Sequence, residues 1–155
     1  MLANRNESYL IPDLFEALQT ERLSFFSTVD AETGAPFMNA VSWVYASNDQ
    51  TLRIAVDSRS KIIDNIHRNA LVSLAVFASE STYTISGNAK VVSNRLEDVP
   101  LKASVIEVAI NEVRDVMFYG SKIVVEPAYE KTYDLQAAEK LDRQIMNALK
   151  QKRIQ

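Results

Sequence analysis

The clearest chemical signal in the sequence is a group of serine and basic residues at the start of a short amphipathic stretch. Residues 58–69 read SRSKIIDNIHRN, and the spacing of the isoleucines predicts a helix. A helix start presents unpaired backbone N–H groups and a dipole that favours an anion. Ser60 would add a hydroxyl donor there, and Lys61, with Arg59 beside it, would add positive charge. The stretch is compatible with a phosphate site, but the residues alone favour the simpler interpretation that Ser58 or Ser60 is an N-cap and Lys61 is solvated.

The scarce residue types exclude several other chemistries. The sequence has no Cys, which excludes thiolate catalysis, disulfides and cysteine-based zinc sites. Its three glycines lie too far apart for a phosphate-binding P-loop or a dinucleotide-binding turn. No metal site is predicted. His67, the only histidine, is interpreted as a half-exposed residue at a helix end rather than as a catalytic group.

Size and charge restrict the class of protein further. A chain of 155 residues, 47% of them hydrophobic, predicts one globular domain. The formal net charge of −3 disfavours nucleic-acid binding, which normally needs a basic surface. Met1 to Ser8 is polar and carries no signal-peptide core, and no apolar run approaches the roughly 20 residues that span a bilayer. We therefore expect a cytoplasmic protein with no membrane partner.

The elements that must position these residues are mostly strands. After a predicted helix at Pro12–Thr20, apolar runs bounded by turn residues predict three strands. They span Leu23–Val29, Phe37–Ala46 and Thr51–Val56 and read as a hairpin meander. In the turn at residues 30–36 we expect Gly34 at positive φ.

The second half of the chain mixes predicted helices and strands. The helix in residues 58–69 leads to strands at Leu71–Phe77 and Thr82–Ser93, the second with a bulge or close approach at Gly87. A helix is predicted within Arg95–Asp115, after Pro100, because four apolar residues share one side of it. Short strands at Val116–Tyr119 and Lys122–Glu126, continued by Tyr129–Leu135, and a closing helix at Gln136–Arg153 complete the prediction.

Six or so sequential strands favour a mainly β protein, an antiparallel barrel or sandwich. We expect a single domain over residues 1–155. Its parts are an N-terminal helix in residues 1–22, a barrel core in residues 23–93, and a helix, further strands and the C-terminal helix in residues 94–155. The short helix inserted between the third and fourth strands is unusual for a plain up-and-down barrel.

That inserted helix belongs to an ordered set of pieces between Leu23 and Val92: VSWVY, LRIAV, SRSKIIDNIHRN, LVSLAVF and TYTISGNAKVV. Their order resembles that of the FMN-binding split-barrel family, the pyridoxamine 5′-phosphate oxidase-like proteins. The resemblance implies an antiparallel split β-barrel, Greek-key-like, with a short helix inserted between barrel strands and a C-terminal helix. It also implies FMN as the cofactor and a homodimer in which each flavin lies at the subunit interface.

The resemblance assigns roles to several residues. It implies a phosphate site at Ser60 and Lys61, assisted by Arg59, and a ring site on the backbone of the second strand. The implied cofactor-binding residues are Val41, Ser42, Trp43, Arg59, Ser60, Lys61 and Thr82. For Trp43 and Tyr45 the alternative to packing against the ring is a place in the core or the dimer interface.

Departures from the family pattern bear on the activity. The oxidase begins its second-strand motif with an arginine and ends it with a lysine, where this chain has Ala40 and Tyr45. The C-terminal third of this chain reads YGSKIVVEPAYEKTYDL plus a final helix, whereas the oxidase has a segment there whose arginine binds the substrate phosphate. We therefore expect no oxidation of pyridoxamine phosphate. The chain looks more like oxidase-related or general-stress-type flavoproteins.

The preferred function is a flavin-dependent oxidoreductase that acts on a small, unidentified substrate, with the flavin cofactor carrying out the redox chemistry. The sequence names no catalytic residue. One alternative is a non-enzymatic module that binds flavin, deazaflavin or haem, and another is a structural barrel without a ligand.

Overall fold

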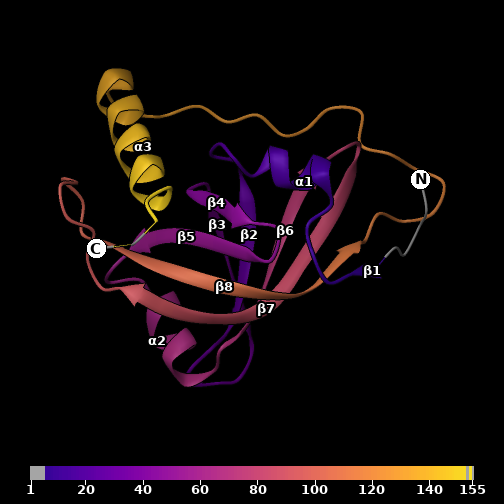
Figure 1. Cartoon of the computed structure of the whole chain (residues 1–155), viewed down its shortest axis with the longest axis horizontal. Helices are drawn as coiled ribbons and strands as arrows, with labels where there is room; N and C mark the ends of the chain where they lie inside the picture. Colours follow the sequence, from indigo (N-terminus) through magenta and orange to yellow (C-terminus); the bar gives the residue numbers. More distant parts are fainter. Residues whose placement is uncertain (1–5, 153, 155) are drawn as a thin grey trace.

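The computed structural model describes residues 6–152 and residue 154. Within them the chain forms eight strands and three helices (Figure 1). The strands are β1 (Asn6–Glu7), β2 (Ser24–Val29), β3 (Pro36–Val41), β4 (Val44–Asn48), β5 (Thr51–Asp57), β6 (Leu71–Ala78), β7 (Ser81–Ser93) and β8 (Ala103–Asp115). The helices are α1 (Pro12–Ala17), α2 (Lys61–Arg68) and α3 (Leu135–Leu149). The prediction of a mainly β fold with peripheral helices is confirmed.

The sheet closes on itself at one short junction. Its strands pair antiparallel in the order β3-β2-β6-β7-β8-β5-β4, with β1 beside β8. β3 and β4 therefore lie at opposite ends of the pairing order, yet only Ser42 and Trp43 separate them in the chain. The sheet must curl until its two edges meet at this junction, which makes the fold an antiparallel barrel.

The barrel interior follows from alternating side chains. In β2 and β6 every second residue is buried, as expected of strands with one face against a core. Phe26, Leu74 and Ile85 are fully buried in the main apolar cluster. A second, smaller cluster joins β5 and β8 to α3 through residues such as Val105, Ile145 and Leu149.

The helices cover the barrel from different sides. In Figure 1, α2 lies below the strands, whereas α1 and α3 lie above them. α2 buries its isoleucines, and the buried Asn65 side chain donates to Thr28 Oγ1 over 2.9 Å and accepts from the backbone N–H of Ala31 over 2.9 Å. This amide fixes α2 against β2 and the turn that follows β2.

The predicted helix over Arg95–Asp115 is wrong, because residues 103–115 form the strand β8. β8 pairs with β7 on one side and β5 on the other, so it is an interior strand of the sheet that forms the barrel wall. A register shift at Ser86/Gly87 inserts an extra residue into β8, and the first part of β8 is buried on both faces. Both features remove the regular alternation, and the remaining apolar spacing resembles that of a helix. The barrel core therefore extends beyond the predicted residues 23–93.

The single strand predicted over Phe37–Ala46 is in fact two strands. β3 pairs with β2, and β4 pairs with β5, so the expected meander is a pair of hairpins. The chain leaves the ladder at Ser42, whose carbonyl oxygen accepts from the N–H groups of both Arg22 and Val44. A kink at this position turns the chain from one edge of the sheet to the other.

The strands predicted at Val116–Tyr119, Lys122–Glu126 and Tyr129–Leu135 are absent, since residues 116–134 form a long irregular segment. It is attached by backbone hydrogen bonds such as Ile123 N–H to Glu80 O, over 2.7 Å. The closing helix α3 ends at Leu149, and Arg153, the predicted last residue, lies outside the described residues. The short β1 was not predicted.

Two glycine predictions are confirmed. Gly34 has φ +74° in the turn between β2 and β3. Gly87 lies opposite the bulge in β8, and a Cβ atom on it would collide with the backbone carbonyl of Ala109 in β8.

None of the helices in the described part of the chain is both long enough and apolar enough to cross a membrane.

Candidate cofactor site

A cavity of about 280 Å³ lies at the β3–β4 junction, where the two ends of the sheet meet. One wall is the end of β3 with the β3–β4 junction, and the other is the end of β5 with the start of α2. The lining residues are Asn39, Ala40, Val41, Ser42, Trp43, Ala55, Val56, Asp57, Ser60 and Ile62. Four of the residues that the sequence predicted as cofactor-binding, Val41, Ser42, Trp43 and Ser60, therefore line one cavity although up to 19 positions separate them.

The β3 wall combines apolar surface with one unsatisfied acceptor. The Oδ1 atom of Asn39 is buried and has no hydrogen-bond partner among the described residues. A buried acceptor without a donor is costly, so this atom in the cavity wall is a position at which a bound molecule could supply the donor. A flavin ring has an N–H group on its polar edge and flat apolar faces, and this wall fits both. The cavity volume lies just below the range of about 300–1,000 Å³ that is typical of ligand pockets.

Trp43 is held from behind by the C-terminal helix. Its indole N–H donates to Asp142 Oδ1 over 2.8 Å, and Asp142 Oδ2 forms an ion pair with Lys131 Nζ over 2.9 Å. The Tyr129 side chain lies near the Ser42 side chain, which slightly opposes the rise in the pKa of Tyr129. Residues from α3 and from the irregular segment 116–134 thus orient the β3–β4 junction. Trp43 also packs against the cluster under α3, so it belongs to both the core and the cavity wall.

The charges behind the junction perturb one another. Burial raises the pKa of Glu21, and the negative charge of Asp142 adds to that rise, while Lys131 opposes it. Burial lowers the pKa of Lys131, but its hydrogen bond with Asp142 and the charge of Glu21 more than offset this, so the pKa is raised overall. Burial and the charge of Glu21 also raise the pKa of Tyr129. A charged lysine therefore lies between two carboxyl groups directly behind the cavity wall.

The α2 side of the cavity carries the predicted phosphate-binding residues. Ser60 is the N-cap of α2, and its hydroxyl accepts from the N–H of Ile62 over 3.2 Å. Arg59 and Lys61 flank Ser60, but neither is a lining residue. The Arg59 guanidinium pairs with Asp57 over 3.0 Å, and Lys61 Nζ pairs with Asp30 over 2.8 Å. Both cations are thus engaged within the chain.

The other residues singled out from the sequence lie elsewhere. Thr82 is on β7 opposite Phe77 of β6, and it does not line the cavity. Tyr45, on β4, packs against the cluster under α3, as the core interpretation predicts. His67 is exposed in the last turn of α2, the helix-end position that the sequence predicts.

Three residues of the site were missed by the sequence analysis. Asn39 lies two positions before Val41 and so on the same side of β3, a signal that strand periodicity could have provided. Asp57 directly precedes the basic stretch and could have been recognised as a partner for it. Asp142 is 99 positions from Trp43, and nothing in the sequence connects the two.

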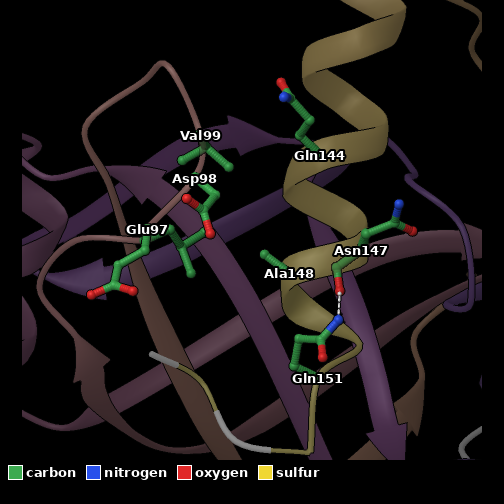
Figure 2. Close-up of a pocket in the computed structure, with 8 residues that line it drawn as sticks. Glu97, Asp98, Val99, Gln144, Asn147, Ala148 and Gln151 are labelled. Carbon is green, nitrogen blue, oxygen red and sulfur yellow. Dashed lines mark hydrogen bonds between the residues drawn. The ribbon is translucent and has the colours of Figure 1, made fainter.

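A larger cavity, about 420 Å³, lies between the loop after β7 and the end of α3. Figure 2 shows Glu97, Asp98 and Val99 on the loop opposite Gln144 and Asn147 of α3, with Gln151 just after the helix. Among the described residues that line it, none is Lys or Arg. It contains none of the predicted cofactor residues and offers no cation for a phosphate, so we assign the candidate site to the smaller cavity.

Comparison with known protein families supports the resemblance in the sequence. Residues 10–133 match the family model for pyridoxamine 5′-phosphate oxidase. This span includes every residue that lines the candidate cavity. A comparison with curated proteins finds no match.

Several solved structures share the fold. A candidate pyridoxamine 5′-phosphate oxidase from Lactobacillus delbrueckii is 19% identical with a TM-score of 0.61, over 72% of this chain and 98% of its own. General Stress Protein 26 from Bacillus anthracis str. Sterne is 16% identical with a TM-score of 0.51, over 65% of this chain and 89% of its own. An F420 reductase is 18% identical with a TM-score of 0.51, over 65% of this chain and 96% of its own. At these identities the likeness concerns the fold.

Proposed function

Because the chain belongs to the pyridoxamine 5′-phosphate oxidase family, we propose that it is an FMN-binding flavoprotein that passes electrons between the flavin and a small substrate. The observation that carries this proposal is the cavity at the β3–β4 junction, where Val41, Ser42, Trp43 and Ser60 meet beside an acceptor that lacks a donor, Asn39 Oδ1. When bound, FMN supplies the redox chemistry, and the protein binds and orients it.

Each end of the cofactor has a matching part of the cavity. The β3 wall, with Asn39 and the backbone around Ser42, would hold the ring, and Trp43 would cover part of its surface. The N-terminus of α2, with Ser60, would receive the phosphate, and Arg59 and Lys61 would supply positive charge. Thr82 has no role within this single-chain cavity, so any contact that it makes with the cofactor would come from a second copy.

We further propose a homodimer in the cytoplasm. A cavity of about 280 Å³ in a single chain is too small and open to enclose a flavin, so a second copy would complete the site. The proposed substrate is not pyridoxamine phosphate. The exposed Ala40 and the core residue Tyr45 stand where the oxidase carries basic residues, and neither can pair with a phosphate.

The test is to load the purified chain with FMN, desalt it, and record the visible absorbance spectrum together with Trp43 emission. Trp43 is the only tryptophan and lines the cavity, so flavin bound there should quench its fluorescence. We expect flavin bands to co-elute with the protein and Trp43 emission to fall. A folded protein that retains no flavin and shows no quenching would contradict the proposal.

A deazaflavin is the second candidate ligand. It is favoured by the structural likeness to an F420 reductase and by the α2 N-terminus, which would serve the phosphate of either cofactor. Repeating the loading experiment with F420 separates the two, because only the preferred cofactor should survive desalting.

A further inference from the structure

Asp57 gives the candidate cavity an unexpected charge. Among the described residues that line it, Asp57 is the charged one, so the cavity itself is acidic although it lies beside two basic residues. The pKa of Asp57 is lowered to about 2, chiefly by the hydrogen bonds from the Arg59 side chain and backbone. Asp57 is therefore an anion at any pH at which the protein would work.

The Asp57 carboxylate occupies the groups that would otherwise bind a phosphate. Its Oδ1 atom accepts from the Arg59 backbone N–H over 2.8 Å and from Nε over 3.2 Å, and its Oδ2 accepts from the far guanidinium nitrogen over 3.0 Å. This two-pronged arrangement is the one by which arginine binds a phosphate. The Arg59 side chain is 81% exposed, so it can be displaced without disturbing the core.

The second cation is engaged more firmly. Lys61 Nζ lies 2.8 Å from Asp30 Oδ2 and 5.5 Å from the centre of the Phe37 ring. The Oδ1 atom of Asp30 also accepts the N–H groups of Glu32 and Thr33, which ties this carboxylate to the β2–β3 turn. Lys61 is therefore held by the fold, and Arg59 is the cation that can be exchanged between partners.

We propose that Asp57 is a specificity-determining residue that limits the affinity of this site for phosphate. A ligand phosphate must compete with Asp57 for Arg59, whose Nε and one Nη already donate to that carboxylate, and must bear the negative charge of Asp57 beside it. The inference rests on the proposed function and adds a consequence to it. The site should bind FMN only slightly more tightly than riboflavin, which has the same ring and no phosphate.

The experiment compares FMN and riboflavin affinities, by flavin and Trp43 fluorescence titration, in the wild type and Asp57→Asn. The asparagine keeps the Oδ1 atom that accepts the Arg59 backbone N–H, so the turn after β5 is preserved. Removal of one negative charge next to a phosphate dianion should tighten FMN binding about tenfold and leave riboflavin binding unchanged.

Glu112→Gln is the matched control. It removes the same charge from another exposed ion pair, with Arg114, but about 30 Å further along β8 than the residue that pairs with Asp57. We expect no change in the ratio of the two affinities. If Asp57→Asn leaves that ratio unchanged or weakens FMN alone, this inference is overturned and the proposed function stands. If no folded variant binds either flavin, the proposed function falls and this inference falls with it.

Discussion

Trp43 and Asp142 connect the candidate site to the far end of the chain. The indole N–H donates to the Asp142 carboxylate on α3, which also forms an ion pair with Lys131. The single buried side chain of Asp142 therefore links the β3–β4 junction and the irregular segment 116–134 to α3. Such a carboxylate is hard to remove, because truncation leaves the indole N–H without its acceptor and takes from Lys131 the nearer of its two carboxylate partners. The wall of the cavity is therefore built partly by residues outside the barrel.

We expect Asp142→Ala to lower the free energy of unfolding by about 2 kcal/mol, the usual value for loss of a hydrogen bond to a charged group. It should also shift the emission maximum of Trp43 in the folded state. Asp142→Asn retains an acceptor for the indole and should restore the emission maximum while the ion pair with Lys131 stays lost. Urea unfolding followed by tryptophan fluorescence measures both effects. An unchanged emission maximum in Asp142→Ala would show that the hydrogen bond does not orient the ring.

Glu21, next to Asp142 and Lys131, should make the stability of the protein depend on pH. Its pKa is raised above the ordinary value of 4.5, first by burial and then by the charge of Asp142. The folded state thus holds the proton more tightly than the unfolded chain does. The contribution of Glu21 to stability is then greatest at low pH and is lost as the pH rises from 4.5 through the folded-state pKa.

Glu21→Gln should remove this dependence. We expect the difference in unfolding free energy between wild type and variant to move in favour of the variant as the pH rises from about 4 to about 8. Urea unfolding at several pH values measures this difference and cancels the opposite trend of Asp30 and Asp57, whose pKa values of about 2 act at lower pH. A difference that stays constant over this range would contradict the prediction.

At the scale of elements, β7 and β8 are 13 residues each and pair along most of their length. Gly87 lies at the bulge where β7 meets the backbone of Ala109, and no side-chain movement can relieve a collision with a carbonyl group. The bulge also shifts the register that brings the two long strands together. The geometry of the barrel centre therefore depends on this one residue without a side chain.

Gly87→Ala should destabilise the fold by about 1–3 kcal/mol, as overpacked sites do. Gly34→Ala is the matched control, because Gly34 has φ +74° but open space where its Cβ would lie. Its cost should come from backbone conformation alone, about 1–2 kcal/mol. Backbone shifts in β8 distinguish the two, and we expect altered amide chemical shifts around Ala109 only in Gly87→Ala. The same shifts in both variants would rule out a steric cause.

At the scale of the whole molecule, apolar side chains are gathered on the irregular segment. Phe118, Tyr119, Val124 and Val125 are 70%, 93%, 83% and 81% exposed. The segment is nevertheless attached, since Arg22 forms an ion pair with Glu126 over 2.6 Å. Exposed apolar side chains grouped on an attached segment are typical of an interaction surface, so this segment is the surface that we expect the proposed homodimer to bury.

If the proposed homodimer forms, we expect a sedimenting species of twice the 17.4 kDa chain mass at micromolar concentration. With FMN present we expect one flavin bound per chain and a higher proportion of dimer, because each ligand would be enclosed by both copies. Analytical ultracentrifugation at flavin and protein wavelengths measures mass and stoichiometry together. A monomer that binds FMN at one per chain would show that the single-chain cavity suffices.

Local patterns in the sequence determined most of the individual elements. The isoleucine spacing and Ser60 specify α2 and its cap, alternation specifies β2 and β6, and Gly34 specifies a turn, because each depends on neighbours in the chain. Short-range stereochemistry and hydrophobic periodicity contain this information, and the run of strands favours a barrel. The resemblance to the family, and not the local patterns, implied that Val41, Ser42, Trp43 and Ser60 share one site.

Only the tertiary structure showed that residues 103–115 form the strand β8, that Arg59 and Lys61 pair with Asp57 and Asp30, and that Asp142 holds the Trp43 indole. β8 is buried on both faces and bulged, so its periodicity is lost until its neighbours are known. Asp30 meets Lys61 across a turn, and Asp142 meets Trp43 across 99 residues, through contacts that no local pattern encodes. The charge of the candidate cavity and the orientation of its tryptophan are therefore properties of the folded chain, because they arise where distant segments pack together.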